Sequence, residues 1–578
     1  MDIPVASRRK PSDPTFAELF TPKLVTILRE GYGWSRFRAD AVAGLTVAIV
    51  ALPLSMAIAI GSGLSPDKGL YTAIVGGFLI SLLGGSRFQI GGPAGAFIVL
   101  VATIVERHGY DGLVLATIMA GMIMLGAGFL RFGTYIKYIP FPVTVGFTAG
   151  IAVIIFASQM KELLGLDMAK EPAALVPKIQ AIAGSIYSVK PATVLLSLLA
   201  IAIMLGLRHY RPKWPGLLIA VGATALLTFL FHLDVATIGT RFGGIPRSLP
   251  APSLPAFDLA MVRAVLPDAI AIALLGAIES LLSAVVADGM TGRRHRSNCE
   301  LVAQGAANIA AVTFGGMCAT GTIARTATNV RANAHGPVAG MLHALYILLF
   351  MLVAAPLAAY IPLAALGAVL AIVAWNMAEK EEFWGLLRGS WADAVVLLAT
   401  FLLTIFEDLT LAIAVGVTLG AFLFLHRMAE AVEVETGHRV MVEDEADSSG
   451  AARTAYDPRD LNGDVVVYRI SGAFFFGATA AVSGVLDRIG EHPKLFVLDL
   501  TGVPFVDSTA AKALERFVHK LRHSGTQVYF AGASANVRRP MLTAGLIKPL
   551  VHYASTTQDA MAHWRSSLAA GDLASQNR

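Results

Sequence analysis

The sequence is poor in charged residues. Only 15% of its 578 residues are Asp, Glu, Lys or Arg, whereas 55% are hydrophobic, and a typical soluble domain carries about 25% charged residues. The mean hydropathy is +0.65. This balance excludes a soluble globular protein and indicates a chain that crosses a membrane many times. The net charge of +5 is spread among loops, so it gives no reason to expect a nucleic-acid partner.

Cysteine is nearly absent, and so are the motifs of common enzymes. Cys299 and Cys318 cannot form a disulfide framework, and neither has the neighbours of a metal site. No nucleophile elbow, phosphate-binding Walker loop or zinc spacing is present. We therefore expect neither an enzyme nor an ATP-driven pump, and no cofactor or metal. Polar sequence follows the basic residues Arg8, Arg9 and Lys10, so no cleaved signal peptide is expected.

Apolar runs and short loops alternate through the middle of the chain. They predict a transmembrane transport domain over 41–427 with about fourteen spans, several of them too short to cross a ~30 Å hydrocarbon core alone. The predicted spans lie near 41–62, 68–84, 91–106, 112–131, 139–163, 192–208, 215–232, 265–287, 301–314, 320–333, 337–356, 361–376, 391–406 and 409–427. Lys and Arg gather in alternate loops, which predicts a multi-pass protein of the cell inner membrane with both termini in the cytoplasm.

The two ends of the chain differ from this middle part. Residues 1–40 are polar and basic and form a predicted cytoplasmic segment, with an amphipathic piece near Phe16 to Leu28 at the membrane surface. An acidic linker is predicted next, followed by a soluble α/β domain and a short tail. The predicted C-terminal parts are the linker 428–463, the domain 464–565 with strands at 465–470, 495–500 and 527–532 and helices at 478–490 and 509–523, and the tail 566–578.

Two glycine-rich stretches interrupt the apolar runs. One covers residues 315–326, where a helix is expected from Thr322 onward, and the other covers residues 91–96, where Pro93 suits a first helical turn. A helix that begins inside the bilayer leaves its first N–H groups unsatisfied, and these attract an anion. Such backbone is tolerated at that depth only when it is buried in protein or lines a wet cavity. A kinked helix with small residues for close packing is the alternative.

The two stretches occupy equivalent places in the two halves of the chain. Each lies at the third of seven predicted spans, and an odd-numbered repeat must be inverted relative to its partner. This arrangement predicts a 7+7 inverted repeat with an anion site between the halves. Arg325 adds a full positive charge at a depth where charge is costly and usually functional.

Glu279 is an acid in the middle of a predicted span. Desolvation disfavours the charged form of a buried carboxylate, so it can hold or release a proton near neutral pH. We interpret Glu279 as the group that couples transport to protons or another co-ion. The alternative is a structural pair with an internal arginine or a backbone turn, and we interpret the nearby Asp288 as structural.

In the soluble domain, Ser508 and Thr509 follow a strand and open a helix. A phosphate at this helix start would be electrostatically favourable, so both are candidates for regulatory phosphorylation. The simpler interpretation is that Asp507 or Ser508 caps the helix.

Three motifs together resemble a known family. The segments 275–288 (LGAIESLLSAVVAD), 91–97 (GGPAGAF) and 320–329 (TGTIARTATN) are similar to those of the SulP anion permeases, relatives of solute carrier family 26, and 464–565 is similar to their STAS domain. The resemblance covers nearly the whole chain and lies nearest the bacterial C4-dicarboxylate permease branch. It implies core and gate domains that move against each other, a homodimer, and a cytoplasmic protein partner for the STAS domain.

The resemblance also implies the substrate site. It places the anion between the starts of the third and tenth spans, beside the first span. The implied substrate-binding residues are Leu54, Ile58, Ala94, Gly95, Ala96, Thr322, Ile323, Ala324 and Arg325. Sodium-coupled relatives look to have Asp in place of Glu279 and a hydroxyl in place of Ile323, which favours protons over sodium here.

Three functions remain open from the sequence. The first is a secondary active anion transporter for sulfate, bicarbonate or C4-dicarboxylate, with proton symport by alternating access. The second is a passive anion exchanger or channel, in which Glu279 is structural. The third is a membrane-anchored anion sensor that acts through its STAS domain. The glycine-interrupted helices in both halves favour the first.

Overall fold

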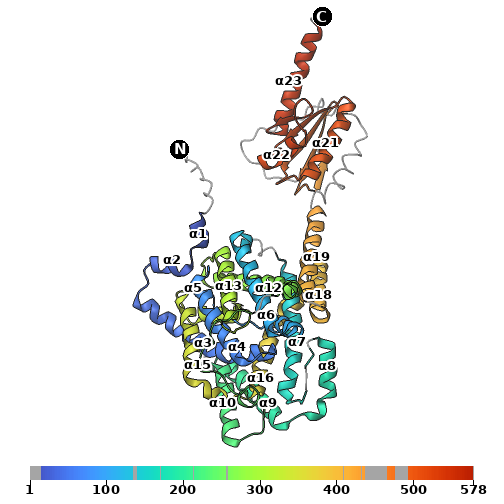
Figure 1. The fold of residues 1–578 in the computed structure, drawn as a ribbon. Coiled ribbons are helices and arrows are strands. Elements are labelled where there is room, and N and C mark those ends of the chain that lie inside the picture. Colours follow the sequence, from blue (N-terminus) through green and yellow to red (C-terminus); the bar gives the residue numbers. More distant parts are fainter. Residues whose placement is uncertain are drawn as a thin grey trace. The chain divides into compact units, whose positions relative to one another are not determined.

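The computed structural model describes residues 15–134, 139–168, 171–172, 174–212, 214–255, 258–407, 409–430, 433–436, 465–475 and 493–576. The chain forms two compact units, Met1–Gly420 and Ala421–Arg578, and each is considered by itself. The helices of the first unit and the sheet of the second are labelled in Figure 1. The predicted helix at 478–490 lies outside the described residues.

The first unit is a bundle of apolar helices, as the composition predicts. Within the described residues, eight helices are long and apolar enough to cross a membrane, and two shorter helices are equally apolar. The long helices are α3 (Trp34–Gly61), α6 (Phe97–Phe129), α7 (Phe141–Leu164), α9 (Pro191–Tyr210), α12 (Leu259–Thr291), α15 (Val338–Ala358), α19 (Leu409–Glu430) and the span Leu363–Arg388, whose first part is α16 (Leu363–Met377). The two shorter ones are α10 (Gly216–Phe231) and α18 (Trp391–Phe406). The membrane class is confirmed, whereas the exact number of spans stays a prediction.

Shorter elements complete this unit. The second predicted span is made of α4 (Pro66–Tyr71), a π-helical turn over Thr72–Gly76 and α5 (Gly77–Leu83). The remaining helices are α1 (Phe16–Phe20), α2 (Lys23–Arg29), α8 (Leu175–Gly184), α11 (Ile238–Phe242), α13 (Ser297–Thr313), α14 (Ile323–Arg331) and α17 (Lys380–Arg388). π-Helical turns break the regular backbone ladder and are frequent at functional sites.

Helix α6 differs from the prediction in two ways. It joins the spans predicted at 91–106 and 112–131, with one non-helical residue, Gly109, at φ 69°. It also begins at Phe97 rather than near residue 91, so Pro93 precedes the helix and the expectation of a first-turn proline is wrong. The reason is that Gly91 and Gly92 form the strand β1 (Gly91–Gly92) and hold the preceding backbone extended.

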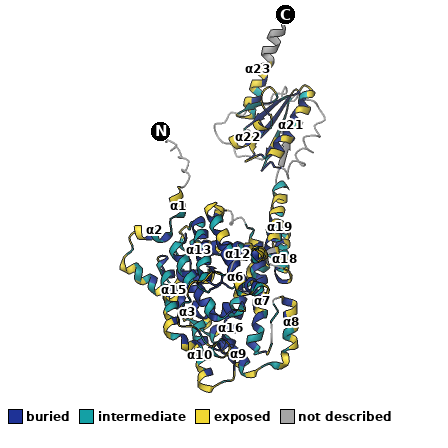
Figure 2. Cartoon of the chain, in the orientation of Figure 1, coloured by how far each residue is buried: buried dark blue, intermediate teal, exposed yellow. Residues whose placement is uncertain are grey.

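Helix α3 lies at the centre of the bundle. All residues from 51 to 59 are buried, which is the pattern of a helix surrounded by protein. Its neighbour α15 approaches closely, because a Cβ atom on Gly44 would lie 2.5 Å from the carbonyl oxygen of Ala339. Figure 2 shows buried residues gathered where helices meet. Exposed apolar residues such as Leu195 and Val353 form outward faces suited to lipid.

The second unit is an α/β domain around one sheet in the order β3-β4-β5-β6-β7. Strands β4 (Val465–Ser471), β5 (Leu495–Gly502), β6 (Gln527–Ala531) and β7 (His552–Ala554) are parallel, and β3 (Glu433–Thr436) joins antiparallel. The helices are α21 (Ser508–His523), α22 (Ala535–Thr543) and α23 (Thr557–Gln576). The three predicted strands are confirmed, while β3 lies in the segment predicted as a linker and the short β7 was missed.

One carboxylate is fixed inside this sheet. Asp499 on β5 accepts hydrogen bonds from Arg469 Nε at 2.9 Å and from the Thr501 backbone N–H and hydroxyl at 2.9 and 2.6 Å. Burial alone would raise the pKa of Asp499, but the bonds from Thr501 and Arg469 outweigh burial and leave that pKa below its ordinary value.

Candidate functional site

The glycine-rich stretches of the two halves pair with each other. Strand β1 runs antiparallel to β2 (Thr320–Gly321), with Gly91 opposite Gly321 and Gly92 opposite Thr320. The pairing continues as Thr322 N–H donates to the carbonyl oxygen of Ile90 at 3.0 Å. Since α6 and α14 begin just after these strands, the crossing brings the starts of both helices together, as the sequence predicts.

Glycine is required on both strands because side chains press against them. A Cβ atom on Gly92 would lie 2.3 Å from Arg325 Nη1, and one on Gly91 would lie 2.3 Å from Ile80 Cδ1. On the other strand, a Cβ atom on Gly321 would lie 1.7 Å from Gln89 Nε2. Real Cβ contacts are not this short, so any larger residue would displace these neighbours.

Polar side chains satisfy the extended backbone inside the bundle. The Thr72 hydroxyl, on the π-helical turn, accepts from Met317 N–H at 2.7 Å. The Asn308 amide accepts from Ala319 N–H and donates to its carbonyl oxygen, both at 2.8 Å. Unsatisfied backbone groups are costly in a bilayer, so these contacts explain how irregular backbone persists at this depth.

Both helices begin without a side-chain cap. The cap residues are Ala96 for α6 and Thr322 for α14, and neither side chain accepts a hydrogen bond from the first turn. The first N–H groups of α14 lack an intrahelical partner, whereas those of Phe97 and Ile98 at the start of α6 donate to the Ala94 and Gly95 carbonyl oxygens at 3.2 and 3.0 Å. They add a partial positive charge to each helix start, which favours an anion.

Arg325 lies one turn inside α14 and is 1% exposed. Its Nη2 atom donates to the Ser55 hydroxyl and to the Pro93 carbonyl oxygen, each at 3.2 Å. Its Nε and Nη1 atoms have no hydrogen-bond partner in the described part of the chain. A buried guanidinium with unused donors is rare, because buried polar groups are normally paired.

The other predicted substrate-binding residues surround these helix starts. Leu54, Ile58, Ala94 and Ala96 are buried, Gly95 and Thr322 are half-buried, and Ile323 and Ala324 are exposed. Helices α16 and α7 close the site near Gly95. A Cβ atom on Gly95 would lie 3.2 Å from Met377 Sδ, 3.9 Å from Ile155 Cδ1 and 4.0 Å from Val373 Cγ1. The site is therefore walled by apolar side chains at α6 and open at the first turn of α14.

Glu279 faces the start of α14. Gly276 and Ser283 lie three residues before it and four after it on α12, and both touch the β2–α14 segment. The Thr320 hydroxyl donates to the Gly276 carbonyl oxygen at 3.1 Å, and Ser283 donates to the Thr326 hydroxyl at 3.0 Å. Residues at this spacing share one helix face. Glu279 is half-buried, and no hydrogen bond or ion pair joins it to the described residues.

Sequence reasoning missed several polar residues of this site. Ser55 contacts Arg325, and Gln89 is buried against Gly321 with neither amide atom partnered among the described residues. Thr326 accepts from Ile90 N–H at 3.1 Å and so fixes α14 to the first half. The available signal was Gln89 itself, a polar side chain just before the Gly91–Gly92 pair, whereas Ser55 carries no local signal.

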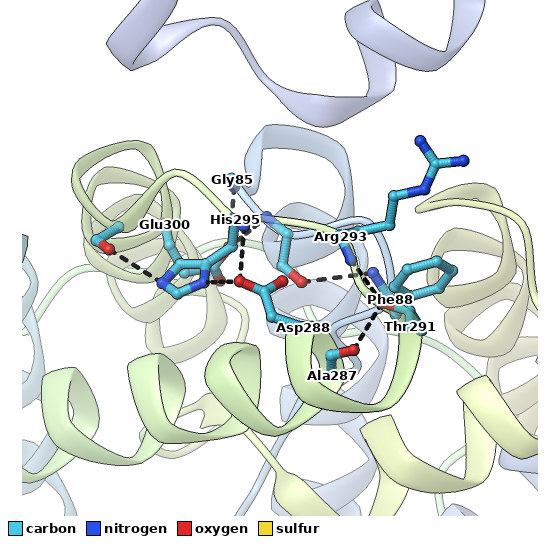
Figure 3. A network of polar contacts seen from close by, with 10 residues as sticks. Gly85, Phe88, Ala287, Asp288, Thr291, Arg293, His295 and Glu300 are labelled. Atoms are coloured by element: carbon cyan, nitrogen blue, oxygen red, sulfur yellow. Dashed lines mark hydrogen bonds and ion pairs between the residues drawn. The ribbon is translucent and has the colours of Figure 1, made fainter. Parts of the chain in front are cut away.

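Two predicted structural roles can be checked directly. Asp288 accepts from His295 N–H at 2.9 Å and lies 2.7 Å from His295 Nδ1, a pair that Figure 3 shows. Its partner is thus His295 rather than the adjacent arginines. In the second unit, Asp507 caps α21 by accepting from Ala510 N–H at 2.8 Å, while Ser508 and Thr509 are exposed.

The first unit is a polytopic helical bundle with a buried cation between two helix starts. This arrangement is typical of membrane transporters with broken helices. Residues 37–400 match the model of the Sulfate permease family, and residues 459–560 match the STAS domain. The chain belongs to the Sulfate permease family and carries a STAS domain. It is a multi-pass membrane transporter rather than an enzyme.

Individual relatives agree with this assignment. The chain is 38% identical to YvdB of Bacillus subtilis (strain 168) over 521 residues, covering 89% of this chain and 95% of that protein. It is 31% identical to the bicarbonate transporter BicA of a Synechocystis species, covering 87% and 89%. The murine Solute Carrier 26 family member A9 anion transporter shares the fold, with a TM-score of 0.82, 97% of both chains covered and 18% identity.

Proposed function

We propose that the protein is a secondary active transporter of small anions that works by alternating access with proton symport. The observation that carries the proposal is the Arg325 guanidinium, buried between the uncapped starts of α6 and α14 with Nε and Nη1 unused. The free groups of Arg325 are N–H donors, so they fit a ligand that presents acceptors and carries negative charge.

The proposed substrate class rests on the apolar side chains around Gly95 and on the family and relatives of the chain. The family name and BicA support sulfate and bicarbonate as substrates. The apolar contacts at Gly95, with Met377, Ile155 and Val373, suit a ligand with a short carbon body, so a C4-dicarboxylate belongs to the same proposal. Flux of labelled sulfate, bicarbonate and fumarate into proteoliposomes, each with and without a pH gradient, separates the three.

Protons are the proposed co-substrate, and neither sodium nor a cofactor is required. Glu279 faces the start of α14, and no described residue forms a hydrogen bond or ion pair with it. An ionised carboxylate there would repel an incoming anion. When Glu279 takes up a proton, this repulsion disappears, so proton and anion enter together. The symport depends on this one side chain.

The test is Glu279→Gln, which keeps the shape of the protonated side chain. The variant is expected to bind anion at least as tightly as the native protein, with affinity nearly independent of pH. It should exchange labelled for unlabelled anion across the membrane but fail to accumulate anion against a gradient. Accumulation by Glu279→Gln under an inward proton gradient would show that Glu279 does not couple the fluxes.

The alternatives predict different results in the same vesicles. A passive exchanger or channel would carry anion at the same rate with and without a proton gradient, in both native and Glu279→Gln protein. An anion sensor acting through the STAS domain would bind anion without moving it. The uncapped helix starts in both halves favour transport, because they build one site from both parts of the bundle.

The same proposal includes the setting of the transporter. We place the chain in the inner membrane with both termini in the cytoplasm, as a homodimer whose STAS domain contacts a cytoplasmic protein partner. Phosphorylation of Ser508 or Thr509 would add negative charge at the start of α21, where the Asp507 side chain already caps the helix. Both hydroxyl residues are exposed, so a kinase could reach them.

A further inference from the structure

The N-terminal helices are fixed to the ends of two bundle helices. Lys23 N–H donates to the carbonyl oxygen of Gly84, and Arg296 N–H donates to that of Gly85, both at 2.9 Å. The Arg296 side chain returns the contact, because Nη1 donates to the Thr21 carbonyl oxygen at 2.7 Å and to the Thr26 hydroxyl at 3.0 Å. Helix α2, the end of α5 and the start of α13 therefore form one surface.

This surface carries an excess of positive charge. We call its five cationic side chains the basic cluster, and they are Lys23, Arg36, Arg87, Arg293 and Arg296. Three carboxylates, Glu18, Glu30 and Asp288, lie within their electrostatic reach, so five cationic side chains face three acidic ones.

Glu30 and Asp288 already have partners of their own. Arg87 binds both oxygens of Glu30 through Nη1 and Nη2. Asp288 accepts a hydrogen bond from the His295 backbone N–H and also contacts the His295 ring. In the described residues, no ion pair joins Arg36 or Arg293 to a carboxylate.

The ionisation of neighbouring groups reports the same excess. Hydrogen bonding by Arg87 holds the pKa of Glu30 below its ordinary value, and the charges of Arg293 and Arg36 add to this effect. Burial and the charges of Arg296 and Arg87 lower the pKa of Lys23, although Asp288 and Glu30 oppose them. The field at this surface therefore favours an additional anion.

Arg293 is free to meet such an anion. Its guanidinium extends away from the Asp288–His295 pair in Figure 3. The residue is exposed, and the one hydrogen bond found for it within the described ranges is made by its backbone N–H, to the Thr291 hydroxyl at 3.4 Å. Arg36 approaches the same carboxylate, Glu30, from the first turn of α3 and donates to the Gly31 carbonyl oxygen.

Large apolar side chains flank the basic cluster. Trp34 is 77% exposed and Leu28 is 56% exposed, on either side of Glu30 in the chain. Trp34 stacks on Phe37, with ring centroids 5.3 Å apart. Exposed tryptophan beside arginine is typical of the level where lipid headgroups meet acyl chains.

We propose that the basic cluster binds the phosphate headgroup of an anionic phospholipid, with Arg36 and Arg293 on the phosphate and Trp34 and Leu28 against its acyl chains. Charge complementarity and the adjoining apolar side chains both select a lipid over a soluble anion. The bound lipid would anchor the N-terminal helices, and through them the ends of α5 and α13, to the membrane. The inference is independent of which anion the protein transports.

The test is binding of short-chain lipids to the purified full chain in neutral detergent. The probes are short-chain phosphatidylglycerol, short-chain phosphatidylcholine and inorganic phosphate. We expect the native protein to bind phosphatidylglycerol and to bind the other two weakly. Because each arginine near a lipid headgroup contributes about a fivefold change in affinity, Arg36→Ala with Arg293→Ala should weaken binding roughly 30-fold. Trp34→Ala should weaken phosphatidylglycerol binding without affecting phosphate.

The matched control is Arg247→Ala with Arg263→Ala, which removes the same charge from two exposed arginines elsewhere in the chain. It should leave phosphatidylglycerol affinity unchanged, and the thermal midpoints of all variants should match the native value. An equal loss in both double variants would reduce the effect to overall charge and overturn the proposal. Equal binding of phosphatidylglycerol and inorganic phosphate would overturn it as well, since it would show a site for a free anion.

Discussion

Replacing Arg325 by alanine is the sharpest test of where the anion binds. The substitution removes the full positive charge that is buried at the crossing of the two halves. It also removes Nε and Nη1, which have no partner among the described residues and which the proposed site assigns to the anion. The fold should survive, because the crossing itself is held by backbone pairing between β1 and β2.

The structure sets the expected size of the effect. Hydrogen bonds to charged groups contribute about 1.5–3 kcal/mol each, so two lost donors correspond to about 3–6 kcal/mol of binding free energy, or roughly 10²- to 10⁴-fold in affinity. Stability changes less. The Pro93 carbonyl oxygen loses the Arg325 donor at 3.2 Å, and an unsatisfied buried acceptor costs about 1–3 kcal/mol.

The assay is equilibrium binding of labelled anion to purified, monodisperse protein, with thermal unfolding measured on the same samples. Arg325→Lys should recover part of the affinity, because it keeps the charge and loses the planar fork. Thr328→Ala is the matched control, since that residue is on the same helix and, among the described residues, its hydroxyl bonds only to the Ala324 carbonyl oxygen, at 2.8 Å. Native affinity in Arg325→Ala would place the site elsewhere and refute the reasoning.

Three further outcomes are expected. Gly92→Ala should lower anion affinity on the order of 100-fold, because the new Cβ would lie 2.3 Å from Arg325 Nη1 and must displace that atom by about 1 Å. Gly91→Ala is the control in the same binding assay and should leave affinity nearly unchanged, because its Cβ meets Ile80 instead. Deletion of 464–578 should leave a membrane unit with native anion affinity, although its transport rate in vesicles can fall. Loss of all anion binding in monodisperse truncated protein would contradict the independence of the two units. The folded-state pKa of Asp499 is depressed, so its contribution to stability is present above the ordinary pKa of about 3.9 and is lost as pH falls through the folded-state pKa. In thermal melts of the isolated STAS domain, the melting temperature of Asp499→Asn should therefore fall less steeply at acid pH than that of the native domain.

Composition and periodicity were sufficient to predict the fold class. Long apolar runs predict most of the helices of the first unit, and buried strands such as Leu495–Leu500 predict the sheet of the second. The prediction was wrong at the start of α6, because local preference at Pro93 favours a helix. The long-range pairing of Gly91 with Gly321 overrides that preference, and single-residue propensities contain no information about it.

The candidate site was predicted in outline and not in detail. A cation among glycines within an apolar run points to Arg325, whereas its partner Ser55 lies in an ordinary apolar helix with no local signal. The same holds for Asn308, which satisfies Ala319 from the preceding helix α13. Contacts of this kind depend on how helices pack, so the sequence predicts which residues are functional better than which residues position them.

The β1–β2 crossing also bears on the proposed coupling of proton and anion. Arg325 contacts Ser55 on α3 and Pro93 before α6, while Ser283 on α12 contacts Thr326 on α14. The helix that carries Glu279 and the segments that surround Arg325 are thus joined through the first turns of α14. In the proposed symport, an anion bound at Arg325 would act on Glu279 through these contacts. The proposed coupling thus relies on α14, whose first turns contact both the helix that carries Glu279 and the segments around Arg325.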